Sequence, residues 1–81
     1  MEINFSRHAE RRMRLYKIDE QDIRNAIESA IMDKGLIEGK NQTVVYELRK
    51  KYHYPLKIVF VVKNDNIMVI TAYPLKKERA Q

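Results

Sequence analysis

The chain contains no cysteine, no tryptophan and only two glycines among its 81 residues. Without cysteine it has neither a disulfide framework nor a thiolate metal site. With glycine only at positions 35 and 39, it has no glycine-rich phosphate-binding loop. Its longest strictly apolar run is Ile58–Val62, whereas a membrane-spanning helix needs about 20 such residues. We therefore expect a cytoplasmic protein without a membrane segment.

The small size of the chain limits the number of domains, and its two scattered histidines argue against a metal site. A chain of 81 residues is long enough for one small domain, so residues 1–81 are expected to form a single domain. His8 and His53 are far apart in the sequence, and the acidic residues show no ligand spacing. We accordingly expect neither a metal ion nor a cofactor.

Basic residues are concentrated in two segments on either side of an acidic one. Residues 7–17 carry five basic side chains and one acid, and residues 49–57 carry four basic side chains and no acid. Between them, residues 19–33 carry five acids and one arginine. This pattern predicts one positive face, which would attract a polyanion such as RNA. The alternative is an ordinary charged surface that keeps the protein in solution.

Helical signals are confined to the first half of the chain. Ser6 is the expected cap of a helix over residues 7–16, which has a narrow apolar stripe. Asp19 is the expected cap of a second helix, which ends at Gly35 and has a broader stripe. The apolar residues of the two stripes are Ala9, Met13 and Tyr16, followed by Ile23, Ala26, Ile27, Ala30 and Ile31.

The second half of the chain has the pattern of strands. The expected strands are Val44–Arg49, Leu56–Val62 and Ile67–Tyr73, with a short additional one at Leu36–Glu38. Asn64–Asn66 is a turn signal, and short connections favour antiparallel neighbours. The predicted fold class is α+β, with two N-terminal helices packed on one face of a three- to four-stranded antiparallel sheet in the order ααββββ.

His8 and Arg12 are the leading catalytic candidates. In the predicted helix His8 lies in the first turn, where free backbone N–H groups attract an anion, and Arg12 lies one turn further along. Histidine suits proton transfer near neutral pH, and a guanidinium can hold a phosphate. Each has an ordinary alternative, since a lone histidine is usually structural or simply exposed and Arg12 can brace a carboxylate elsewhere.

Thr71 is the third catalytic candidate. If its strand lies beside the first helix, its hydroxyl can meet His8 and Arg12. Threonine is also an ordinary strand residue, and most threonines in strands have no chemical role. The sequence alone does not decide between these two interpretations.

The basic and aromatic segment at residues 49–55 lies between two predicted strands and is expected to be an exposed hairpin loop. Its cations would grip phosphates, and its aromatic rings would stack on unpaired bases. The expected nucleic-acid-binding residues are Arg49, Lys50, Lys51, Tyr52 and Lys57. The alternative is a charged loop whose tyrosines pack onto the edge of the sheet.

The opening segment Phe5–Met13, together with Ile18, resembles a small prokaryotic domain family of uncharacterised function. Its members open with a pattern close to F-S-x-H-A-x-x-R-M-x-x-R-G-I. They end on a hydrophobic strand with a threonine, which Val69–Tyr73 resembles. That family has been placed in the barnase–EndoU–colicin–RelE (BECR) class of metal-independent ribonuclease folds. The resemblance implies N-terminal helices against a four-stranded antiparallel sheet.

The resemblance also implies an active site made of His8, Arg12 and Thr71. The chain departs from the pattern at Tyr16 and Lys17, where the family has arginine and glycine. If that arginine binds phosphate, the departure implies weaker RNA binding or a loss of activity. Some members of the wider class are toxins restrained by an antitoxin, which makes an antitoxin-like protein a conceivable partner.

The leading functional hypothesis is a small metal-independent endoribonuclease or a toxin-like relative, with RNA as its partner. A ribose 2′-OH would attack the adjacent phosphate, with His8 as base or acid, Arg12 as the phosphate clamp and Thr71 as a positioning hydroxyl. A second hypothesis is a non-catalytic nucleic-acid-binding module that uses the same basic surface. A third is a protein-interaction or regulatory domain, whose acidic helix and basic face recognise another protein.

Overall fold

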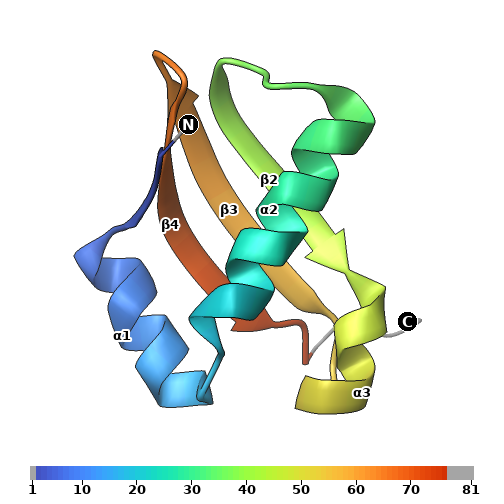
Figure 1. The fold of residues 1–81 in the computed structure, drawn as a ribbon. Helices are drawn as coiled ribbons and strands as arrows, with labels where there is room; N and C mark the ends of the chain where they lie inside the picture. The colour runs from blue at the N-terminus through green and yellow to red at the C-terminus, as the bar shows by residue number, and fades with distance from the viewer. Residues whose placement is uncertain (1, 77–81) are drawn as a thin grey trace.

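The computed structural model describes residues 2–76, in which four strands form one sheet flanked by helices (Figure 1). The elements in chain order are β1 (Glu2–Phe5), α1 (Arg7–Tyr16), α2 (Glu20–Lys34), β2 (Gly39–Val45), a 3₁₀ helix η1 (Tyr46–Leu48), α3 (Arg49–Tyr52), β3 (Leu56–Lys63) and β4 (Asn66–Pro74). The predicted α+β class is confirmed. No helix within the described residues is long and apolar enough to cross a membrane.

The sheet is mixed, whereas the sequence predicted a purely antiparallel one. The strand order is β1-β4-β3-β2, and β1 runs parallel to β4 with Ile3 opposite Ile67 and Phe5 opposite Val69. The β4–β3 and β3–β2 pairs are antiparallel, as expected. The prediction was wrong about β1 because two apolar side chains in four residues make too short a pattern to distinguish from irregular chain.

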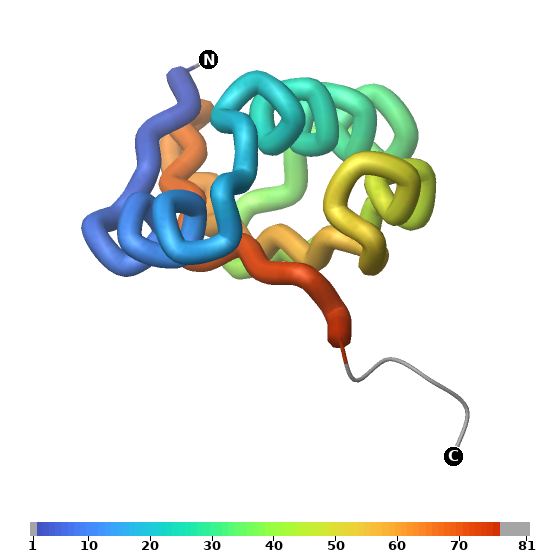
Figure 2. Tube along the Cα trace, turned by 90° about the horizontal axis from the view of Figure 1, so that it is seen from below, coloured from blue at the N-terminus to red at the C-terminus, as the bar shows by residue number. Residues whose placement is uncertain are grey.

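Helix α2 supplies the helical side of the core. Ile23 and Ile27 are fully buried in one cluster with alternate residues of β3. Those residues of β3 are Leu56, Ile58, Phe60 and Val62. Asp19 is the cap, as predicted, and its Oδ1 accepts a hydrogen bond from the Gln21 backbone N–H at 2.9 Å. Figure 2 shows α2 on one side of the strands, so this face of the sheet is covered.

Helix α1 lies along the part of β4 that follows the short pairing with β1 (Figures 1 and 2). Ala9 is fully buried in the core, which anchors the helix at the edge of the sheet. A bulge interrupts β4 at this point, because Phe60 pairs with Val69 whereas Val59 pairs with Thr71. Ile70 is therefore an extra residue in β4, and the strand bends where α1 begins.

The segment between α2 and β3 differs most from the prediction. Leu36–Glu38 is not a strand, and β2 begins at Gly39, five residues before the predicted start at Val44. The strand ends at Val45, and the predicted hairpin loop at residues 49–55 contains α3 instead. The physical reason for α3 is a set of hydrogen bonds and ion pairs between α3 and the start of α2, which no local sequence pattern can reveal.

Candidate functional site

Ser6 fastens the first turn of α1 to β4. Its hydroxyl donates a hydrogen bond to the Ile70 carbonyl at 3.0 Å and accepts one from the Ala9 backbone N–H at 3.0 Å. Its own backbone N–H donates to the Val69 carbonyl at 2.9 Å. One hydroxyl therefore caps the helix and also binds a carbonyl at the bulge. The start of α1 consequently lies beside the residues that precede Thr71.

His8 and Thr71 lie on these two elements without a bond between them. His8 is exposed in the first turn of α1, so apolar packing does not seal its imidazole. Thr71 is half-buried opposite Val59 and alternates with the fully buried Ala72. Its side chain therefore points to the sheet face turned away from α2. Within residues 2–76 no hydrogen bond joins His8, Arg12 and Thr71, so their convergence around one anion stays a prediction.

Arg12 is directed toward the C-terminal end of α1. The side chain is half-buried, and its Nη1 donates a hydrogen bond to the Tyr16 hydroxyl at 3.4 Å. The Lys76 ammonium lies 5.5 Å from the centroid of the Tyr16 ring. In this chain the tyrosine holds one cation by its hydroxyl and a second over its ring.

Lys57 and Thr71 share one face of the sheet. Lys57 pairs with Tyr73 and Val59 pairs with Thr71, so Lys57 and Thr71 are diagonal neighbours across β3 and β4. Diagonal neighbours are about 7–8 Å apart, which is within the reach of a lysine side chain. The fold thus brings one predicted RNA-binding residue near one predicted catalytic residue.

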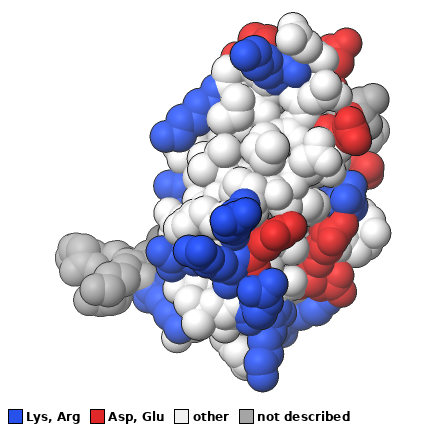
Figure 3. Space-filling view, turned by 90° about the vertical axis from the view of Figure 1, so that its left-hand side faces the viewer, with Lys and Arg blue, Asp and Glu red and all other residues white. Residues whose placement is uncertain are grey.

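The exposed surface of α1 is basic. Arg7, Arg11, Arg14 and Lys17 are exposed, and none of them forms an ion pair within residues 2–76. Figure 3 views the molecule from the side that carries α1, and basic side chains gather on its lower part while acids lie toward the right, where α2 runs. On this face the basic side chains therefore border the acidic ones and are not remote from them.

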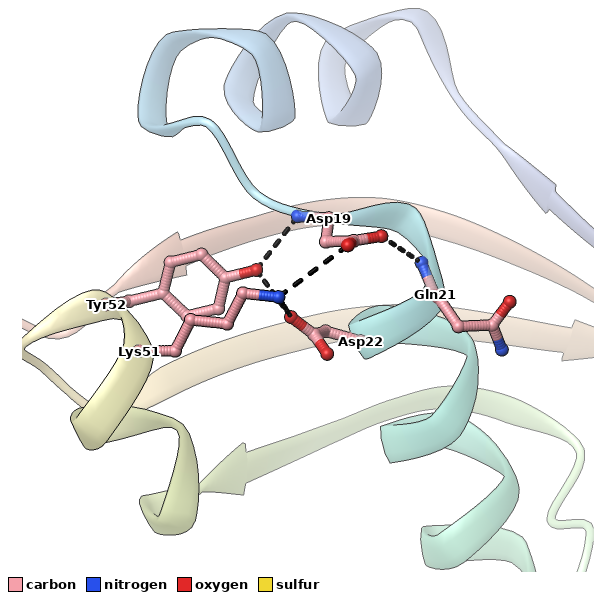
Figure 4. Close-up of polar contacts among 5 residues, drawn as sticks. All are labelled: Asp19, Gln21, Asp22, Lys51 and Tyr52. Atoms are coloured by element: carbon pink, nitrogen blue, oxygen red, sulfur yellow. Dashed lines mark hydrogen bonds and ion pairs between the residues drawn. The ribbon is translucent and has the colours of Figure 1, made fainter.

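Helix α3 is held to the start of α2 by four polar contacts (Figure 4). The Lys51 ammonium lies 2.8 Å from Asp22 Oδ2 and 3.6 Å from Asp19 Oδ2. The Tyr52 hydroxyl donates to Asp22 Oδ2 at 2.6 Å and accepts from the Asp19 backbone N–H at 2.9 Å. We call these four residues the α2–α3 latch. Within the described part of the chain, no three His, Asp or Glu side chains are placed to hold a metal ion together.

The latch keeps its charged groups charged at neutral pH. The hydrogen bond from Lys51 is the main reason that the pKa of Asp22 lies below its usual value, and the bond from Tyr52 acts in the same direction. The hydrogen bond to Asp22 raises the pKa of Lys51. Burial, followed by the bond to Asp22, raises the pKa of Tyr52. Two of the five predicted RNA-binding residues are thus engaged by acids of the same chain.

The other predicted RNA-binding residues lie in different surroundings. Arg49 and Lys50 are exposed on α3, whereas Lys57 is half-buried on β3. The basic segment is therefore divided between a helix and the sheet face, and does not form one loop.

A groove lies between the C-terminal end of α1, α3 and the end of β4. It has a volume of about 400 Å³. Its lining residues are Tyr16, Lys17, Lys51, Tyr52, His53, Tyr54, Pro74 and Lys76. We call it the lysine–tyrosine groove. The Leu75 backbone N–H donates to the Pro55 carbonyl at 2.8 Å, which fixes the end of β4 against the loop after α3.

Sequence reasoning identified part of this groove. The aromatic rings expected to stack on bases, those of residues 49–55, include Tyr52, His53 and Tyr54 of the groove, but the sequence did not connect them with Lys17 or Lys76. Those two lysines lie in the sequence far from the loop and from each other, and the fold alone brings them together. The charge excess at residues 7–17 was the available signal for Lys17, whereas nothing in the local sequence placed Lys76.

One family model matches residues 5–74, from the last residue of β1 to the last residue of β4. Its description is a domain of unknown function, DUF4258. A comparison with the curated proteins finds no match. The family match includes Ser6, the latch and every strand pairing of the sheet from Phe5 onward. The chain belongs to the DUF4258 family.

Proposed function

We propose that the protein binds RNA and cleaves it without a metal ion. The observation that carries the proposal is the arrangement at α1, where an exposed histidine lies in the first turn of a basic helix whose start is bonded to the strand of Thr71. A basic surface attracts a polyanion, and a helix N-terminus offers N–H groups to a phosphate. The resemblance of the opening segment to the barnase–EndoU–colicin–RelE class supports the same activity.

In the proposed reaction the 2′-oxygen of a ribose attacks the adjacent phosphorus as the bond to the 5′-oxygen breaks. The products are a 2′,3′-cyclic phosphate and a 5′-hydroxyl. His8 takes the proton of the 2′-OH or gives a proton to the departing 5′-oxygen, and water completes the other transfer. Proton transfer by one positioned side chain contributes about 10²–10⁴-fold to such a reaction.

Arg12 and Thr71 position the phosphate in this proposal. A guanidinium can hold two phosphate oxygens at once and stabilise the charge that develops on them. The Tyr16 hydroxyl orients Arg12 from one turn further along α1. Thr71 contributes a hydroxyl from the sheet face, with Lys57 as its diagonal neighbour.

A non-catalytic nucleic-acid-binding module remains the second candidate, because the exposed cations of α1 serve binding equally well without any proton transfer. It predicts RNA affinity that falls with salt and does not change in His8→Ala. A toxin-like role predicts that expression of the chain arrests growth unless an antitoxin-like protein is present.

The test is incubation of the purified protein with an end-labelled RNA in the presence of a chelator. We expect cleavage products with a cyclic phosphate end, and a rate at least about 100-fold lower in His8→Ala. Circular dichroism checks that the variant is folded. The matched substrate carries a single 2′-deoxy sugar at the main cleavage position, and it must resist cleavage there. Unchanged cleavage in His8→Ala would remove the proposed mechanism, and no cleavage by the wild type would leave only the binding module.

A further inference from the structure

The lysine–tyrosine groove lies at the opposite end of α1 from His8. Tyr16 and His8 are separated by eight residues, which is about 12 Å along a helix that rises 1.5 Å per residue. Figure 1 shows α3 and the C-terminal end of α1 at the same end of the sheet. The groove is therefore distant from His8, whereas Arg12 bonds to the Tyr16 hydroxyl at the wall of the groove.

The groove is lined by three lysines, Lys17, Lys51 and Lys76, which differ in their acidic partners within residues 2–76. Lys51 is balanced by Asp22 in the α2–α3 latch. Lys17 and Lys76 are exposed and form no ion pair within residues 2–76. An anion entering the groove thus meets two lysines without an ion pair among the described residues, and the Lys76 ammonium lies 5.5 Å from the centroid of the Tyr16 ring.

The groove also presents aromatic rings. Tyr54 is 39 % exposed, and Tyr16 and Tyr52 are half-buried in the walls. The exposed His53 is held at this place by its backbone N–H, which donates to the Arg49 carbonyl at 2.7 Å. Rings of this kind stack on unpaired bases of any sequence. The volume of about 400 Å³ falls in the range of small-ligand pockets, about 300–1,000 Å³, which suits a nucleotide unit better than a duplex.

We infer that the lysine–tyrosine groove binds a nucleotide unit of single-stranded RNA, with Lys17 and Lys76 on phosphates and the Tyr54 ring against a base. The inference rests on the proposed function in taking RNA as the ligand, but it does not depend on cleavage. The groove would hold one part of the strand while another part lies near the first turn of α1.

The first experiment measures the binding of a fluorescein-labelled eight-nucleotide oligouridine RNA by anisotropy, in a chelator and in a His8→Ala background. The groove variant is Lys17→Gln with Lys76→Gln. The matched control is Lys34→Gln with Lys63→Gln, which makes the same change in net charge at exposed positions outside the groove. We expect the groove variant to bind at least about tenfold more weakly. The slope of its log affinity against log salt concentration should become shallower by about 0.7 for each phosphate that it no longer binds. Equally weakened binding in the two variants would overturn the inference.

The second experiment tests stacking. Tyr54→Ala is expected to weaken binding about fivefold or more, as the loss of one base–aromatic stack does, whereas Tyr54→Phe keeps the ring and the affinity. Equal affinity of Tyr54→Ala and the wild type would contradict the stacking contact. Duplex RNA of the same length must bind more weakly than the single strand, and tighter duplex binding would contradict the choice of ligand.

The outcomes separate this inference from the proposed function. If the groove variant loses binding but the wild type cleaves no RNA, the groove stands and the catalytic proposal fails. If His8→Ala abolishes cleavage but the groove variant binds like its control, the catalytic proposal stands and the groove inference fails.

Discussion

Two basic segments of this chain have the same charge balance and different surroundings. Residues 7–17 hold five basic side chains against one acid, and residues 49–57 hold four against none, so each has a balance of +4. In the first segment the exposed arginines of α1 have no ion pair within the described residues. In the second segment Lys51 is paired with Asp22. A count of charges along the sequence therefore does not show which charges can meet a ligand.

The same comparison applies to the way the two segments fold. Helix α1 begins at a residue that caps its own first turn, since the Ser6 hydroxyl accepts from the Ala9 N–H. Helix α3 is only four residues long and has no side-chain cap. Its conformation depends on Lys51 and Tyr52 bonding to α2. A helix of one turn is marginally stable by itself, so the contacts of the latch provide the stability that the local sequence of α3 does not.

The largest expected effect on stability comes from Ser6→Ala, at the residue that caps α1. The change removes a helix cap and leaves the Ile70 carbonyl without its donor, which together cost about 1–2 kcal/mol. Urea unfolding measures the free energy. Ser29→Ala is the matched control, because Ser29 is exposed within α2 and alanine, the better helix former, is expected to raise stability there by less than about 0.7 kcal/mol. Equal stability of the two variants would show that Ser6 does not fasten α1 to β4.

Lys17→Gly is expected to stabilise the protein by about 1 kcal/mol while it weakens RNA binding. Lys17 ends α1 in the left-handed conformation, with a φ of 56°, which glycine adopts without the strain of a side chain. Thermal unfolding and RNA anisotropy measure the two effects on one variant. A lower melting temperature would contradict the role of the left-handed cap, and unchanged affinity would contradict the role of Lys17 in the groove.

Features set by neighbouring residues could be predicted from the sequence. The caps at Ser6 and Asp19 and the turn at Asn64 and Asp65, whose φ values are 53° and 67°, were expected from residue type and were confirmed. Strand β1 was not expected, because its stability comes from pairing with β4 about 64 residues away in the chain.

In the candidate site, too, features set by neighbouring residues were predicted and features that join distant residues were missed. His8 could be placed in the first turn of a helix because the cap and the helical period are local signals. The latch and the groove were missed because each joins residues from separate elements, such as Asp22 with Lys51 and Lys17 with Lys76. The roles of His8, Arg12 and Thr71 in catalysis remain predictions for the assays above.

Asp22→Asn is expected to have a smaller effect, below about 1 kcal/mol, because the latch is partly exposed. The lowered pKa of Asp22 means that its carboxylate stabilises the fold above about pH 4, and this contribution is lost as the pH falls through the folded-state pKa. The raised pKa of Lys51 adds stability that is lost only in strong alkali. Urea unfolding at pH 7 and pH 3 must therefore show a larger difference between wild type and variant at pH 7. A constant difference would contradict the ion pair.

The smallest expected effect is on RNA affinity. It tests whether Asp22 keeps Lys51, in the second basic segment, from binding RNA. Asp22→Asn removes the acid that neutralises Lys51, so RNA is expected to bind roughly threefold more tightly. Glu28→Gln makes the same charge change at an exposed position of α2 and is the control. If both variants bind RNA equally, the latch does not withhold Lys51 from the ligand.

The most direct test is a titration of the ¹⁵N-labelled His8→Ala protein with a short single-stranded RNA, followed by amide chemical shifts. The account predicts that the largest shifts fall at residues 7–17, at His53 and Tyr54, and at Lys76, while the loop at residues 36–38 beyond the far end of α2 stays unchanged. Shifts confined to the acidic start of α2 or to that far loop, or no shifts at all, would contradict it.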